Sequence, residues 1–179
     1  MRSSRLTRRL SIASLALVAL SPLALGVSFS VAELTRSAAR IFRGRCVAAR
    51  PGTVDFRGRP LAATAYTFEV SEYLKGDGPP TLTFRQTGTP ERGVTDLGRI
   101  AGLTVFAPGS EYVVFLRPES KAGLTSAAGR GRGVFLVSGE TARVVDADGR
   151  TPAPGSEIIA YGALRDAVQQ VFRQDSRRR

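Results

Sequence analysis

Few residues in this sequence are of types that can do acid–base, nucleophilic or metal chemistry. The 179 residues include no histidine and a single cysteine, Cys46. Histidine is the usual general base and the usual zinc ligand, so serine–histidine catalysis, cysteine–histidine catalysis and histidine-ligated metal sites are excluded. One cysteine cannot form an internal disulfide or a four-thiolate zinc site. Cys46 shares a predicted strand face with Phe42, so we expect a buried, inert thiol.

The carboxylates and lysines form no recognisable catalytic pair. Glu69 and Glu72 are three residues apart on a predicted strand and therefore point to opposite faces. No lysine lies at the Ser-x-x-Lys spacing of a serine–lysine dyad. The remaining enzymatic hypothesis pairs Glu111 with Asp96, and nothing in the sequence places these two together. We therefore expect no catalytic residues, no metal ligands and no cofactor.

Two glycine-containing segments match ligand-binding loops only in part. Residues 146–149 begin like a calcium loop, but no third carboxylate and no closing glutamate follow. We expect a turn there. Residues 129–133 alternate glycine with Arg130 and Arg132, yet they lack the lysine and hydroxyl residue of a phosphate loop. We expect a strand kink with two exposed arginines.

One predicted loop combines an aromatic ring with basic side chains. Phe56, Arg57 and Arg59 form this group. Proteins that bind single-stranded nucleic acid or oligosaccharide use aromatic stacking beside positive charge. Together with Arg130 and Arg132, these residues form the candidate binding surface.

The first 29 residues have the features of an export signal. Four arginines and no acidic residue precede an apolar stretch at positions 10–29. Small residues predict cleavage after Gly26, which makes residues 1–26 a signal peptide; cleavage after Ser30 is the second candidate. We expect a periplasmic or secreted protein.

The route of export and the fate of the leader stay open. Positions 10–29 span 20 residues, close to the roughly 20 that a helix needs to cross a bilayer. The alternative is therefore an uncleaved inner-membrane anchor, with membrane contact only through residues 10–29. Arg8 and Arg9 resemble part of a twin-arginine signal, but Ser11 replaces the expected aromatic or leucine, which favours Sec export.

Much of the net charge of +11 lies at the chain ends. The leader contributes four positive charges and Arg177–Arg179 three, which leaves a modestly basic body. Nucleic-acid-binding domains instead concentrate basic residues on one face. This distribution disfavours a nucleic-acid partner, and we expect residues 174–179 to be a disordered basic tail.

Helices are predicted only at the two ends of the mature chain. Ser30 and Glu33 form a capping box for a short helix that reaches about Ala39. Near the C-terminus, Ser156 is predicted to cap a final helix. Its apolar face is expected to contain Ile158, Tyr161, Leu164, Val168 and Phe172.

Alternating apolar and polar residues predict short strands between these helices. The expected strands are 41–50, 64–74, 81–86, 111–117, 124–128 continued by 133–137, and 141–145. A long connection at 87–110 is of a length that is often functional. Glycine bends inside the strands favour an OB-like antiparallel barrel of five or six strands, closed or half-closed. Residues 27–173 are the expected single domain.

Five segments resemble a family of uncharacterised exported bacterial proteins. They read IFRGRCVAAR, AYTFEVSEYLKGDG, TLTFRQTG, PGSEYVVFLRP and GLTSAAGRGRGVFLV, within residues 31–145. The barrel of that family is similar to the netrin-like fold of tissue inhibitors of metalloproteinases. The animal inhibitors chelate the protease zinc through an N-terminal cysteine, whereas this mature chain would begin at Val27 or Val31. The resemblance therefore implies a fold and not that inhibitory mechanism.

Two classes of function follow. The first is a non-catalytic exported binding domain whose partner is an extracytoplasmic protein, with a secreted hydrolase such as a protease as the candidate. It needs only an exposed surface and adaptable loops. The alternative is an OB-type binder of polyanionic oligosaccharide or single-stranded nucleic acid, whose binding weakens as salt rises.

Overall fold

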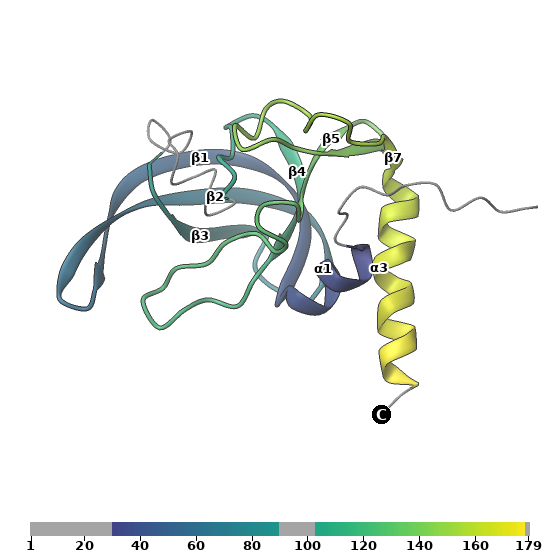
Figure 1. Ribbon diagram of the computed structural model, residues 1–179, viewed down its shortest axis with the longest axis horizontal. Coiled ribbons are helices and arrows are strands. Elements are labelled where there is room, and N and C mark those ends of the chain that lie inside the picture. Colours follow the sequence, from purple (N-terminus) through teal and green to yellow (C-terminus); the bar gives the residue numbers. More distant parts are fainter. Residues whose placement is uncertain (1–29, 90–102, 178–179) are drawn as a thin grey trace, which may run out of the picture.

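The structure is a computed structural model and describes residues 30–89 and 103–177. Its strands form one antiparallel sheet in the order β3-β2-β1-β4-β5-β6-β7 (Figure 1). The strands are β1 (Arg40–Phe56), β2 (Arg59–Lys75), β3 (Thr81–Thr87), β4 (Glu111–Leu116), β5 (Val134–Ser138), β6 (Thr141–Val144) and β7 (Ile159–Ala160). The helices are α1 (Val31–Ser37) and α3 (Tyr161–Ser176), which lie side by side at one end of the sheet.

The expectation of a mainly β domain with a helix near each end is confirmed, but the sheet is open. It has seven strands rather than the predicted five or six. Within the described ranges, no ladder joins β3 to β7. Strands β6 and β7 extend the sheet beyond β5, and β7 leads directly into α3.

Three β-bulges bend the long strands β1 and β2. The pairing register skips Leu74 and Ser71 on β2 and Val47 on β1. Each bulge inserts one unpaired residue, which increases the local twist and bends the strand. The two strands consequently curve along their whole length instead of running straight (Figure 1).

The sheet buries a hydrophobic core on each face. One core contains six aromatic side chains: Phe42, Tyr66, Phe68, Phe84, Phe106 and Tyr112. The other contains Ile41, Val113 and Phe115 of the sheet together with Leu34 of α1 and Leu164 of α3. Phe106 belongs to the predicted long connection, so the described end of that connection is part of the core and not a free loop.

The capping box of α1 is confirmed. Ser30 Oγ accepts a hydrogen bond from the Glu33 N–H at 3.2 Å, and Glu33 Oε2 accepts one from the Ser30 N–H at 2.9 Å. Leu34 of the helix and Ala38 just after it are buried in the core between α1 and the sheet. The helix itself ends at Ser37.

We expect Ser30→Ala to lower the free energy of unfolding by about 1 kcal/mol, the usual loss when a capping side chain is removed. Urea unfolding followed by circular dichroism measures this. Ser37→Ala is the control, because its hydroxyl only donates to the Leu34 carbonyl inside the same helix. Equal losses for the two variants would contradict the role of the cap.

The C-terminal helix begins later and ends later than predicted. Ser156 does not cap it; the helix begins at Tyr161, and its N-cap Ala160 makes no side-chain cap bond. The reason is that Ile159 and Ala160 pair with β6 as a strand. Ile158 is 65% exposed instead of lying on the apolar face. The helix extends to Ser176, so the first part of the predicted disordered tail is helical.

The rest of the apolar face of α3 is confirmed, because Tyr161, Leu164 and Val168 are buried and Phe172 packs against the same core. The predicted leader (1–26), the apolar stretch at 10–29 and most of the long connection lie outside the described residues. Across the described part of the chain, no helix combines the length and apolar character needed to span a membrane.

Candidate binding surface

The predicted aromatic and basic loop is the tight tip of a long hairpin. Phe56 ends β1 and Arg59 begins β2, so only two residues connect the strands. Arg57 and Gly58 both have positive φ, at 57° and 76°, as required in a two-residue hairpin turn of the primed type. Asp55 Oδ1 accepts a hydrogen bond from the Gly58 N–H at 3.1 Å, which fixes the turn. The guanidinium carbon of Arg57 lies 5.4 Å from the centroid of the Phe56 ring.

The hairpin extends well beyond its neighbours in the sheet. Strand β4 pairs with β1 only as far as Arg45, and β3 pairs with β2 only from Ala63 onward. We call residues 48–61 the outer ribbon. Across the described ranges, residues 48–56 of β1 pair only with β2, and residues 59–61 pair only with β1. The outer ribbon is seen at the left of Figure 1, far from α1 and α3.

One face of this hairpin carries basic and apolar side chains in a row. Cross-strand partners share a face, and so do alternate residues of a strand. Val54 is opposite Leu61, Phe56 is opposite Arg59, and Ala65 lies between Arg50 and Arg85. We call these side chains the ribbon strip: Arg50, Val54, Phe56, Arg59, Leu61 and Arg85. Phe56 is 44% exposed, and the three arginines are exposed as well.

The edges of the outer ribbon are poor templates for an added strand. Pro51 lies in β1 and Pro60 in β2, and proline has no N–H to donate to a neighbouring strand. Proline and charged side chains are common means of blocking edge-to-edge pairing. The side chains of the outer ribbon, rather than its backbone edges, are therefore the groups available for contacts.

Arg130 and Arg132 lie on a different connection of the sheet. Ala128 and Gly133 both hydrogen bond to the backbone of Phe115, so residues 129–132 loop out between two contacts with β4. Both arginines are exposed, as expected, but they lie in a turn and not in a strand kink. The predicted strand at 124–128 is wrong, because this segment pairs with β4 only through the isolated Leu116–Ala127 bridge. Phe115 pairs with Ile41 at the start of β1, whereas Phe56 ends that strand. The five predicted surface residues do not form one patch.

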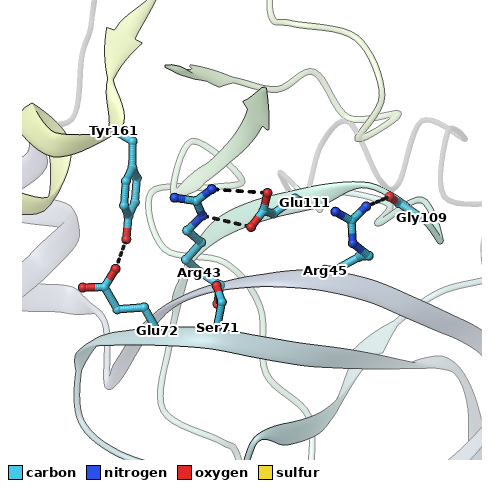
Figure 2. Close-up of polar contacts among 7 residues, drawn as sticks. All are labelled: Arg43, Arg45, Ser71, Glu72, Gly109, Glu111 and Tyr161. Carbon is cyan, nitrogen blue, oxygen red and sulfur yellow. Dashed lines mark hydrogen bonds and ion pairs between the residues drawn. The ribbon is translucent and has the colours of Figure 1, made fainter. Parts of the chain in front are cut away.

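A polar cluster that the sequence did not reveal joins β1, β2 and β4 to α3 (Figure 2). Arg43 Nε donates to Glu111 Oε1 at 2.9 Å, and the Arg43 guanidinium carbon lies 4.4 Å from the centroid of the Tyr161 ring. The Tyr161 hydroxyl donates to Glu72. The hydrogen bond to Glu111 raises the pKa of Arg43, and burial together with the bond to Glu72 raises the pKa of Tyr161.

This cluster seats the first turn of α3 on the sheet. Both of its carboxylates already have partners, because Glu111 binds Arg43 and Glu72 binds Tyr161. Arg45 is also engaged, since its guanidinium donates to the Gly109 carbonyl at 2.6 Å. Glu111 is thus part of a structural ion pair, and its hypothetical catalytic partner Asp96 lies outside the described residues.

The partial calcium loop at 146–149 is a turn, as expected. Asp148 Oδ1 accepts hydrogen bonds from the N–H groups of Arg150 and Thr151, both at 2.9 Å, and Oδ2 accepts from the Thr151 hydroxyl. Within the described residues, no group of three or more cysteine and acidic side chains could hold a metal ion.

Cys46 is fully buried beside the aromatic core. Burial raises the pKa of its thiol from 9.0 to about 11. A raised pKa favours the neutral thiol in the folded state. The stability that this thiol contributes is therefore complete below about pH 9 and is lost as pH rises toward 11.

We expect Cys46 to react with a thiol reagent at pH 8 far more slowly in the folded chain than in urea, because the thiolate is the reactive form. Absorbance of the released thiol product measures both rates. Rapid labelling of the folded protein would contradict the burial of this thiol.

Cys46→Ala is the matched variant for alkaline unfolding. Its free energy of unfolding is expected to fall less between pH 9 and 11 than that of the original chain.

Comparison of the sequence with protein-family models and with curated proteins found no match.

Proposed function

We propose that this chain is a non-catalytic binding module that acts outside the cytoplasm and contacts its partner through the outer ribbon. The observation that carries the proposal is that Phe56 is 44% exposed. It lies on the outer ribbon, which extends beyond the neighbouring strands, and it has basic side chains on either side. An aromatic ring beside positive charge is the combination that binding proteins use for stacking and charge contacts. Export rests on the basic and apolar leader at positions 1–29.

The proposal includes a partly open OB-like barrel similar to the netrin-like fold. Its support is the arrangement around residues 124–128. Ala127 pairs with Leu116 of β4, and the Thr125 N–H donates to the Arg85 carbonyl of β3 at 2.8 Å. This segment therefore lies between β3 and β4, the neighbours it would have in a five-stranded OB-like barrel. Zinc chelation by cysteine is not part of the proposal, since Cys46 is buried within β1.

The first candidate partner is an exported protein, with a secreted hydrolase such as a protease as its class. An interface of ordinary size buries about 800 Å² on each partner. The outer ribbon is only two strands wide, so a protein partner would also contact the adjoining exposed residues of β1, β2 and β3. The second candidate is a polyanion, favoured by the arginines that flank Phe56 along the ribbon strip.

The test compares the original chain with a variant that has a shortened ribbon. Removing residues 53–56 and 59–62 leaves Gly52 and Ala63 to flank the Arg57–Gly58 turn, and these two residues already pair in the sheet. Each chain is immobilised, exposed to the exported fraction of its host cell and washed at rising salt. Circular dichroism confirms that the variant folds.

We expect the original chain to retain a defined component that the shortened variant does not. Release only at high salt favours the polyanion, and salt-resistant retention of one protein favours the protein partner. Equal retention by both chains would contradict the role of the outer ribbon. Turnover of a substrate by the purified chain would contradict a non-catalytic role.

A further inference from the structure

The ribbon strip has the charge and shape to hold a linear anionic chain. Its charged members, Arg50, Arg59 and Arg85, are all basic. The nearest acidic residue on the hairpin, Asp55, alternates to the opposite face and bonds to the turn. On the face of the strip, the first carboxylate is that of Glu69, two residues beyond Thr67 and opposite Arg45. At about 3.3 Å per residue, Arg50 and Phe56 are about 20 Å apart along β1. The strip is thus a narrow positive track.

Hydroxyl groups continue this track at its inner end. Thr67 and Thr83 are cross-strand partners whose hydroxyl oxygens lie 3.0 Å apart. Thr67 is two residues from Ala65, so it shares the face on which Arg50 and Arg85 flank that alanine. Arginine binds carboxylate and sulfate groups in a bidentate manner, and hydroxyl groups exchange hydrogen bonds with sugar hydroxyls.

We propose that the ribbon strip binds a linear anionic polysaccharide; this inference rests on the proposed binding function and assigns its partner class. The arginines bind the anionic groups, Phe56 stacks on one sugar ring, and Val54 and Leu61 contact its apolar edge. The guanidinium carbon of Arg57 lies over one face of the Phe56 ring, 5.4 Å from its centroid, so the sugar stacks on the other face.

The strip suits this partner better than it suits the other two macromolecules. Single-stranded nucleic acid is held by successive bases stacked on several aromatic rings, and the ribbon strip has one. A face two strands wide and about 20 Å long covers about 200 Å², well below the area of an ordinary protein interface. A polysaccharide chain needs only a narrow track.

The test measures binding of end-labelled galacturonate oligomers by fluorescence anisotropy. Heparin oligomers supply sulfate groups, neutral galactose oligomers lack charge, polyglutamate lacks sugar, and oligothymidylate represents nucleic acid. With three arginines on the anionic groups, we expect affinity for the anionic oligomer to fall about 20- to 40-fold between about 50 mM and about 200 mM salt. Binding of either the galacturonate or the heparin oligomer supports the proposal and identifies the anionic group.

Two variants test the strip itself. The triple substitution Arg50→Gln, Arg59→Gln and Arg85→Gln is expected to abolish the salt dependence and most of the affinity. Its control replaces three other exposed basic residues, Lys121, Arg130 and Arg173, by glutamine and reaches the same net charge. Phe56→Ala is expected to weaken binding of the oligosaccharide about tenfold, as for the loss of one stacking contact, without affecting polyglutamate.

The proposal is overturned by no binding of either anionic oligosaccharide, by binding of polyglutamate or oligothymidylate at least as tight, or by equal losses in the triple variant and its control. These results leave the proposed function intact if the outer ribbon still retains an exported protein. A different result would overturn the proposed function: the variant with the shortened ribbon would retain the same components as the original chain.

Discussion

Phe68→Ala is expected to lower the free energy of unfolding by about 3–5 kcal/mol, the usual loss for a buried phenylalanine. Phe68 is 0% exposed and lies at the centre of the aromatic core. The centroid of its ring lies 5.3 Å from those of Phe42 and Phe106 and 5.7 Å from that of Phe84. These rings come from β1, β2, β3 and the connection before β4, so the cavity would loosen all of them together.

Phe56→Ala is the matched control, because it removes the same side chain from an exposed position on the neighbouring strand. We expect it to change the free energy of unfolding by less than about 0.5 kcal/mol. Urea unfolding of both variants, followed by tyrosine fluorescence, gives the two values. Similar losses would show that the outer ribbon, and not the described aromatic core, supports the fold.

Gly149→Ala is expected to lower the free energy of unfolding by about 3 kcal/mol or more. Gly149 has φ of 66°, a conformation that strains any residue with a Cβ. A Cβ at this position would lie 1.5 Å from the carbonyl oxygen of Val105, so the backbone has to move. That movement would also disturb the Tyr112 hydroxyl, which donates to the Gly149 carbonyl at 2.6 Å.

Gly139→Ala separates the conformational strain from the clash. Gly139 has nearly the same φ, 60°, but no atom lies within 4 Å of an added Cβ. We expect a loss of about 1 kcal/mol from strain alone. Thermal unfolding of the two variants measures the difference. If Gly149→Ala were no worse than Gly139→Ala, the 146–149 turn would not be fixed against Val105.

Local patterns in the sequence are enough to predict the first helix and the parts of β1 and β2 that lie outside the outer ribbon. Phe42 and Cys46 on one face of β1 and Phe68 on one face of β2 follow from alternation, which depends only on the pleat of a strand. The Ser30–Glu33 capping box follows from a spacing of three residues. Such signals are short-range, so they can be read from the sequence without knowledge of tertiary contacts.

The outer ribbon was missed because its composition is that of a loop. Pro51, Gly52, Gly58 and Pro60 usually interrupt strands. The hairpin continues through them since each strand has the other as a partner, and Arg57 accepts a left-handed conformation beside Gly58. Phe56, Arg57 and Arg59 lie together at a hairpin tip and not in the predicted loop.

The polar cluster at α3 could not be predicted from local patterns. Arg43 and Glu111 are 68 residues apart, and Glu72 and Tyr161 are 89 apart. Their meeting depends on the pairing of β1 with β4 and on the docking of α3. The early end of β1–β4 pairing at Arg45, which frees the outer ribbon, is likewise a tertiary feature.

Binding at the ribbon strip is tested by following backbone amide resonances of the isotope-labelled chain during titration with galacturonate oligomers and, separately, heparin oligomers. We expect shift changes concentrated at residues 50–61 and 83–87, lost in the Arg50→Gln, Arg59→Gln and Arg85→Gln variant. Changes centred on residues 129–132 or on α3, or no changes with either oligomer, would contradict binding at the strip.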